Sequence, residues 1–258
     1  MKKNTILYRI LLPVLVLFSQ ACKKDYGDLN HATVENFIAN ATVAELNNLV
    51  SGTESGMRSE VTLYLDDAGI LGREYYRFNS AEPRYVTDMV GGGQAALTGD
   101  NFYIGNTWGG FYQVVKNCNI LVQSAMNSKS IGAAERGGYL GFARTIKAYE
   151  LLLCLNLVDT NGIRIRVEDP DHLGPFVKKT EALNAISALL DSARTDFGNA
   201  TIDYTLTGFS SFPDAAGLTR VNRALAARVA AYRQDWAGVL TCLNNSFLDM
   251  NGDFSLGV

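Results

Sequence analysis

Few residues of this chain belong to the types that carry out hydrolytic or metal-dependent chemistry. Its 258 residues include two histidines, His31 and His172. A zinc-protease helix needs two histidines on one face, and a Ser-His-Asp triad needs a histidine beside a serine nucleophile. Neither histidine is placed for these arrangements, and we interpret both as surface residues. We therefore expect no catalytic residue, no metal ligand and no cofactor.

Three other clusters resemble parts of known sites but lack the spacing that those sites need. The glycines at 91–93 could cradle a phosphate, but no Lys-Ser or Lys-Thr follows at P-loop spacing. A calcium-loop-like series without its distal glutamate lies at Asp249, Asn251 and Asp253. We interpret both segments as turns. Asp66 and Asp67 form a carboxylate pair in a stretch that we expect to be a loop, but paired acids alone do not identify a glycosidase.

The residue with the most specific chemical context is Cys22. Two lysines begin the chain, an apolar run follows at 10–18, and Ala21 directly precedes the cysteine. This order is that of a secretory signal peptide, and Ala21-Cys22 resembles the lipobox at which lipoprotein signal peptidase cuts. The apolar run is shorter than the roughly 20 residues of a membrane-spanning helix, and Pro13 interrupts it.

We therefore expect residues 1–21 to be removed as a signal peptide and Cys22 to be lipidated. Several acyl chains, at about 0.8 kcal/mol per buried methylene, would hold the protein stably on a membrane. Residues 22–30 are then a short polar tether. The alternative is that Cys22 merely lies near an ordinary secretory cleavage site.

Composition indicates a folded chain without a nucleic-acid partner. Hydrophobic residues make up 47% of the chain and charged residues 19%, which suits a protein with a real core. The net charge is −3 and the 23 basic residues are scattered, whereas nucleic-acid binding needs a concentrated basic surface. No Pro-rich or Ser-rich linker divides residues 31–258, and we expect them to form one domain.

Helical periodicity dominates this domain. Thr42 and Glu45 have the spacing of a capping box, which predicts a helix that runs to about Met57. Apolar residues recur at steps of three and four in further segments. These segments are 111–127, 133–157, 183–197 and 221–232. Asp235 can cap a short helix at 236–243, so that two helices form a hairpin. We expect a mostly α fold of tetratricopeptide-like hairpins with long irregular loops.

Three cysteines fall within these helical segments, at Cys118, Cys154 and Cys242. Their neighbours are apolar, and the odd number that is left after Cys22 argues against a fully paired disulfide framework. We interpret them as three buried thiols, with one chance pair left open.

Two stretches between the helices, 64–110 and 158–178, are expected to be irregular. Sugar rings stack on exposed aromatic side chains, while Arg, Asn and Asp bind hydroxyl groups. The first stretch combines these residue types. Its candidate ligand-binding residues are Arg73, Tyr75, Tyr76, Arg84, Tyr85, Tyr103 and Asn106. Trp108 is expected to open a helix and to belong to the core.

Three segments together resemble the SusD/RagB family of nutrient-uptake lipoproteins from the outer membrane of Gram-negative bacteria. Segment 108–121, WGGFYQVVKNCNIL, resembles the Trp, Tyr and Ala-Asn helix of that family, with Cys118 in place of alanine. Segment 141–152, GFARTIKAYELL, resembles its A-R-x-x-R-A-x-x-Y helix, with Lys147 in place of the second arginine. Segment 221–236, VNRALAARVAAYRQDW, resembles a later helix pair.

This resemblance implies a SusD-like α fold and a binding function without a reaction. A SusD-like protein caps a SusC-like TonB-dependent β-barrel transporter and captures an oligosaccharide or peptide. It is anchored in the outer membrane by its lipid and faces the cell exterior. Family members are usually longer, with an irregular C-terminal half. We therefore expect residues 31–258 to be the N-terminal helical-repeat part, with that half absent.

Two other classes of function stay open. A helical-repeat scaffold could dock envelope proteins without a ligand site of its own. A lipid-anchored hydrolase is the third class, and the scarcity of histidine together with the missing nucleophile motif argues against it.

Overall fold

The computed structural model describes residues 34–91, 98 and 101–248. The expected signal peptide, Cys22 with its tether, His31 and the acidic series at 249–253 lie outside the described residues, as do the last two glycines of 91–93. The chain divides after Val34, and the second unit is Glu35–Val258. All described elements belong to the second unit, apart from the first residue of the first helix.

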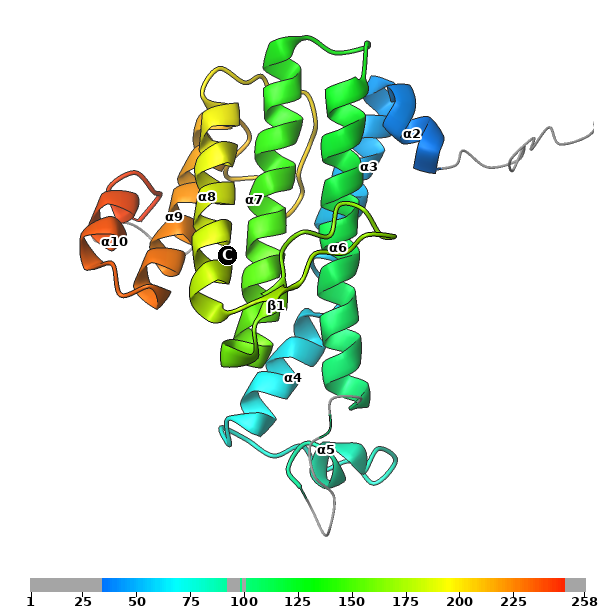
Figure 1. The fold of residues 1–258 in the computed structure, drawn as a ribbon, viewed down its shortest axis with the longest axis vertical. Helices are drawn as coiled ribbons and strands as arrows, with labels where there is room; N and C mark the ends of the chain where they lie inside the picture. The colour runs from blue at the N-terminus through cyan, green and yellow to red at the C-terminus, as the bar shows by residue number, and fades with distance from the viewer. Residues whose placement is uncertain (1–33, 92–97, 99–100, 249–258) are drawn as a thin grey trace, which may run out of the picture. The chain divides into compact units, whose positions relative to one another are not determined.

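Helices make up most of this unit, as expected (Figure 1). In chain order they are α2 (Val34–Asn40), α3 (Val43–Gly56), α4 (Val61–Leu71), α5 (Arg84–Thr87), α6 (Phe102–Asn127), α7 (Ala133–Val158), α8 (Lys179–Phe197), α9 (Ala215–Tyr232) and α10 (Trp236–Leu243). A 3-10 turn, η1 (Asp159–Asn161), and two short antiparallel strands, β1 (Ile163–Arg164) and β2 (Phe176–Val177), lie between α7 and α8. The second expected irregular stretch is therefore largely confirmed.

Side-chain caps determine where several of these helices begin. The capping box at α3 is confirmed: the Thr42 hydroxyl accepts a hydrogen bond from the Glu45 amide at 3.3 Å, and the Glu45 carboxylate accepts one from the Thr42 amide at 2.7 Å. The carboxylate of Asp235 caps α10 as predicted, accepting from the Gly238 amide at 2.9 Å. These bonds satisfy backbone N–H groups that have no partner within the helix.

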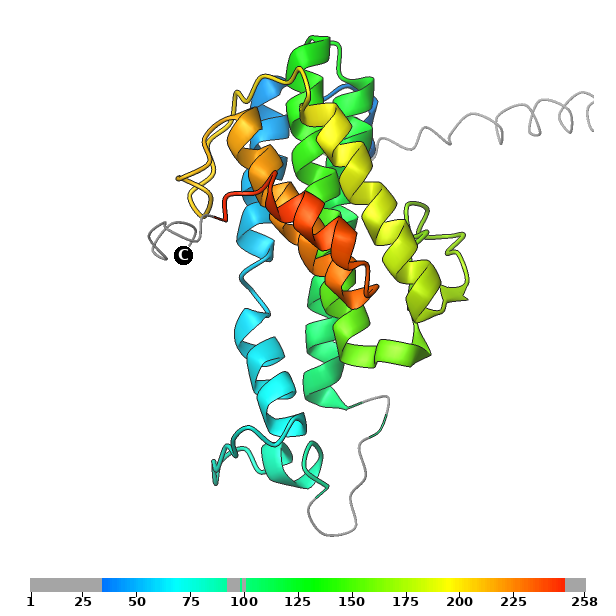
Figure 2. The same ribbon diagram turned by 90° about the vertical axis from the view of Figure 1, so that its left-hand side faces the viewer.

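Helix α7 lies at the centre of the helical packing. It contacts α6 on one side and α8 on the other, and α9 and α3 also touch it (Figure 1). Side chains such as Tyr139, Phe142 and Leu151 are almost completely buried. The 90° view brings α9 and α10 to the front, where α9 packs against α8 and α10 packs against α9 (Figure 2). An apolar helix that is covered on several sides is what the sequence of this segment predicted.

The first expected irregular stretch, 64–110, is partly wrong. Helix α4 continues to Leu71, and α6 begins at Phe102. The Asn101 side chain caps α6 by accepting from the Tyr103 amide at 3.1 Å. Glycines in the first turns of α6 interrupt the apolar periodicity that would have predicted a helix there. One of them is explained by close packing. A Cβ atom on Gly110 would lie 2.1 Å from the Glu60 side chain.

Several individual expectations need correction. Trp108 lies within α6 rather than at its start, and it is half-buried against Tyr112. Tyr232, the last residue of the apolar series at 221–232 that we expected a partner helix to cover, is 40% exposed. It sits in the last turn of α9, where its hydroxyl lies 3.5 Å from the Asn156 side-chain amide at the end of α7. The exposed histidine is as expected: His172 lies at the surface beside Asp169.

One buried carboxyl group has no hydrogen-bonding partner among the residues that the structure describes. Glu150, on α7, is completely buried, and neither of its carboxyl oxygens forms a hydrogen bond there. Cys118 and Cys154 lie close enough for its charge to affect their thiols. Desolvation raises the pKa of Glu150 from 4.5 to about 8. The group is therefore largely protonated at neutral pH.

This pKa shift predicts a pH-dependent stability. Between pH 4.5 and about 8 the folded state binds more protons than the unfolded state, so the free energy of unfolding falls as the pH rises through this window. Glu150→Leu should remove this contribution, on the order of 3 kcal/mol between pH 5 and 8. Urea unfolding of both proteins across this range measures the difference. Parallel pH profiles for the native protein and the variant would contradict it.

Candidate functional site

The candidate residues lie between the end of α4 and the first turns of α6. Helix α5, with Arg84 and Tyr85, occupies the middle of this connection, and Tyr103 and Asn106 lie on α6. The structure thus brings most of the predicted residues to one end of the helical unit. We refer to residues 73–85 and the first turns of α6 as the aromatic loop region.

Stacked aromatic rings and arginines form the inside of this region. The rings of Tyr85 and Tyr103 are stacked with centroids 4.4 Å apart, and both side chains are buried. The Arg77 guanidinium lies 4.6 Å from the centre of the Tyr85 ring. On the other side, the Arg84 guanidinium lies 4.1 Å from the centre of the Phe102 ring and 5.5 Å from that of Tyr103. Cation–π attraction holds such layers together.

The carboxylate of Glu82 fixes the position of Arg84. Arg84 donates to both carboxylate oxygens of Glu82, with its Nε 2.6 Å from Oε1. These bonds lower the pKa of Glu82 to about 2. Burial, together with hydrogen bonds to Tyr85 and Glu82, raises the pKa of Tyr103 well above its usual value. Arg84, Tyr85 and Tyr103 therefore support the region from within, and the prediction that both tyrosine rings contact a ligand is wrong because they are buried.

Tyr75 joins the loop to α4. Its hydroxyl donates to the Asp66 carboxylate at 2.9 Å and lies 3.1 Å from the Leu65 carbonyl oxygen. Arg77 forms an ion pair with the same carboxylate. The Tyr75 ring lies over Gly69, where an added Cβ atom would come within 2.1 Å of it. A glycine in the middle of α4 is thus explained by the close approach of this ring.

The expected loop position of Asp66 and Asp67 is also wrong, since both lie buried on α4. The Thr107 hydroxyl donates to Asp67 at 2.6 Å and links α4 to α6. Desolvation raises the pKa of Asp67 to about 6, against the effect of the Thr107 hydrogen bond, and the charges of Asp66 and Glu60 raise it further. Both acids serve to hold helices and the loop in place, and this carboxylate pair is not accessible to a glycoside.

The accessible part of the region consists of other side chains. Tyr76 and Phe78 stack at 6.2 Å between ring centroids, with 55% and 82% of their surfaces exposed. Phe102 is 49% exposed, and Asn106 is exposed on the next turn of α6. Arg73 has a positive φ of 62° and donates to the Val90 carbonyl oxygen at 3.1 Å.

The candidate residues thus lie close together, but the burial of Tyr85 and Tyr103 contradicts the role predicted for their rings. The sequence prediction omitted Phe78, Phe102 and Arg77, three residues that the structure places beside the predicted ones. The signal for Phe78 was its spacing of two from Tyr76, which puts both rings on one side of an extended segment.

Segments 108–121, 141–152 and 221–236 meet inside the helical unit. The Lys147 ammonium, on α7, donates to the Asn119 side chain on α6 at 2.7 Å and to Glu168 at 2.5 Å. The Asn119 amide in turn donates to the Val167 carbonyl oxygen at 3.1 Å. These buried polar groups connect two of the three segments and tie the 158–178 stretch to them.

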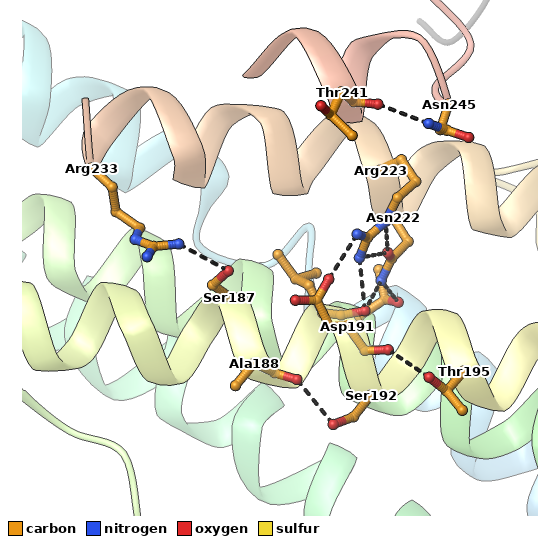
Figure 3. Close-up of polar contacts among 12 residues, drawn as sticks. Ser187, Ala188, Asp191, Ser192, Thr195, Asn222, Arg223, Arg233, Thr241 and Asn245 are labelled. Atoms are coloured by element: carbon orange, nitrogen blue, oxygen red, sulfur yellow. Dashed lines mark hydrogen bonds and ion pairs between the residues drawn. The ribbon is translucent and has the colours of Figure 1, made fainter. Parts of the chain in front are cut away.

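The third segment forms a second buried polar group between α8 and α9 (Figure 3). Arg223 donates to Asp191 at 2.8 Å and to the Leu190 carbonyl oxygen at 2.9 Å. The Asn222 amide donates to the Thr145 hydroxyl at 2.9 Å and so reaches α7 as well. Asn222 and Arg223 are almost completely buried. These residues position helices and do not face solvent.

The three cysteines of the helices are free. Cys118 and Cys154 are completely buried, and burial raises the pKa of both thiols. Cys242 is only half-buried, which corrects the expectation of three buried thiols. None of the three forms a disulfide, and burial keeps Cys118 and Cys154 from acting as reactive thiolates.

Within the described residues, no group of three or more His, Cys, Asp or Glu side chains is arranged to hold a metal ion. None of the helices that the structure describes combines the length and apolarity needed to cross a membrane. The sequence matched no family model, and neither characterised proteins nor solved structures gave a match.

The contact between Gly69 and Tyr75 predicts an unusual response to substitution. Glycine to alanine inside a helix normally stabilises by about 0.5–1 kcal/mol. Gly69→Ala should instead destabilise by about 1 kcal/mol, since the ring must move and give up its hydrogen bonds to α4. Urea unfolding measures both effects.

Two further variants serve as controls. Gly52→Ala, on α3, meets no atom within 4 Å and should show the normal stabilisation. Gly69→Ala should also stabilise when it is combined with Tyr75→Ala. Equal effects of Gly69→Ala with and without the tyrosine would reject the contact.

Proposed function

We propose that this chain is a cell-surface lipoprotein that binds nutrient glycans and works with a SusC-like TonB-dependent transporter. In this role it captures an oligosaccharide, or a peptide, and delivers it to the transporter without altering it. The proposal rests on the lipobox-like Ala21-Cys22, on the SusD/RagB-like segments and on the aromatic loop region.

The observation that carries the proposal furthest is the exposed pair of rings in this region. Tyr76 and Phe78 present stacked aromatic faces to solvent, and Phe78 is one of the most exposed large side chains in the described part of the chain. Isolated exposed apolar residues are common, but neighbouring aromatic rings mark a contact surface. The faces of sugar rings carry C–H groups that pack on such rings.

The contacts that hold Arg77 in place favour glycan binding by the neighbouring rings of Tyr76 and Phe78. Arg77 is held between the Asp66 carboxylate and the Tyr85 ring, and it lies in sequence between Tyr76 and Phe78. Ordering the loop in advance lowers the entropic cost of binding. Asn106 adds an exposed amide that can donate to and accept from hydroxyl groups.

A second candidate function, a scaffold without its own ligand, is favoured by α10. Trp236 and Leu240 are 66% and 64% exposed, although α10 is an apolar helix. Exposed apolar helix faces of this kind bind other proteins. Binding of glycan by the aromatic loop region distinguishes the two functions.

Affinity electrophoresis in gels that contain soluble polysaccharides tests the glycan proposal. The native protein should be retarded weakly by its own glycan class, with Kd on the order of 1 mM. Tyr76→Ala and Phe78→Ala should each remove most of the retardation because they delete a stacking face. Phe176→Ala, which removes a ring with 56% exposure from another loop, should have no effect. Retardation that persists in both loop variants, or its absence with every glycan tested, would favour the scaffold.

Metabolic labelling with radioactive palmitate tests the anchor. The protein expressed in a Gram-negative host should incorporate label, and Cys22→Ala should incorporate none because it lacks the thiol to which the diacylglycerol is attached. Cys242→Ala is the matched control and should be labelled like the native protein. Label that remains in Cys22→Ala would exclude this lipidation site.

A further inference from the structure

A cavity of about 490 Å³ lies against α7, with walls from the junction of α3 and α4 and from α9. Its apolar walls include Met57, Ile146, Phe209, Val221, Leu225 and Phe247. Its volume falls within the range of roughly 300–1,000 Å³ that is typical of small-molecule sites. None of the aromatic loop residues contributes to it, so it is a separate site and does not depend on the proposed function.

Two arginines supply positive charge to this cavity. Arg58, from the end of α3, and Arg228, on α9, both line it and both are exposed. Neither forms an ion pair with an acid of the described residues. Arg228 is oriented by Tyr232, whose hydroxyl lies 3.3 Å from the guanidinium. Both guanidinium groups therefore have donors left for an anion.

The acid that lines the same cavity is already engaged. Glu54 is buried, and its carboxylate accepts hydrogen bonds from the Gly208 amide at 2.5 Å and from the Thr207 amide at 3.2 Å. Its charge holds the 207–208 loop against α3. The cavity thus combines apolar walls, an acid that is satisfied by backbone donors, and two arginines without acidic partners.

We propose that this cavity binds a small carboxylate with an apolar tail, of the chemical class of medium-chain fatty acids. The tail fills the apolar walls, because removal of apolar surface from water is favourable. The carboxylate lies at Arg58 and Arg228, since guanidinium groups match carboxylates in charge and in geometry. The small volume favours such a ligand over a helical peptide, which would need a longer groove.

Isothermal titration of the purified protein with dodecanoate, below its micelle concentration, tests this site. We expect one dodecanoate per chain. Arg58→Gln and Arg228→Gln should each weaken binding about tenfold, the loss expected for one charge-assisted hydrogen bond. Ala224→Phe places a ring in the cavity and should abolish binding. Dodecanol, which lacks the charge, should bind more weakly and should be insensitive to both arginine substitutions.

Arg194→Gln is the matched control, because Arg194 is an exposed arginine on α8 that does not line the cavity. It should leave the affinity unchanged, and circular dichroism should show that every variant is folded. Absence of dodecanoate binding would overturn the proposal, as would binding that survives Ala224→Phe and both arginine variants. A dimer in sedimentation velocity that Ala224→Phe dissociates would overturn it in favour of a second copy of the chain as the occupant.

Discussion

The hydrogen bond from the Lys147 ammonium to the Asn119 side chain is the interaction on which the arrangement of the helices depends. A buried ammonium is costly unless it is paired, and this one is paired with an amide oxygen on α6 and with Glu168 from the irregular stretch. Apolar packing alone would tolerate small shifts of α6 along α7. The polar contact specifies one register, and Arg223 does the same between α9 and α8.

This arrangement explains the composition of segments 108–121, 141–152 and 221–236. Their small residues let helices approach, and their Asn, Lys and Arg side chains form buried bonds between neighbouring helices. Cys118, in the first of these segments, is completely buried. The segments thus describe how the helices pack. The proposed ligand surface, formed by Tyr76 and Phe78, lies outside these segments.

The sequence predicted those parts of the structure that depend on local chemistry. Thr42 with Glu45 and Asp235 identified helix starts, because a cap needs only the residues beside it. The sequence did not predict helix α4 beyond Tyr64 or the first turns of α6. These turns are stabilised by contacts between residues far apart in the chain, such as the hydrogen bond from Thr107 to Asp67. For the same reason, sequence reasoning located the aromatic loop region but not which rings are exposed. Whether a tyrosine faces solvent or stacks on another ring, as Tyr85 does on Tyr103, depends on the fold.

Folding determines when the thiols of Cys118 and Cys154 can react. Thiol–disulfide exchange requires a thiol that is both exposed and ionised. Cys118 and Cys154 are buried, and their raised pKa keeps the thiols protonated. In an oxidising compartment these sulfurs are therefore vulnerable only before folding is complete or after it is lost. Helix packing acts as their protection, and fast folding would keep an unpaired set of cysteines from forming mismatched disulfides.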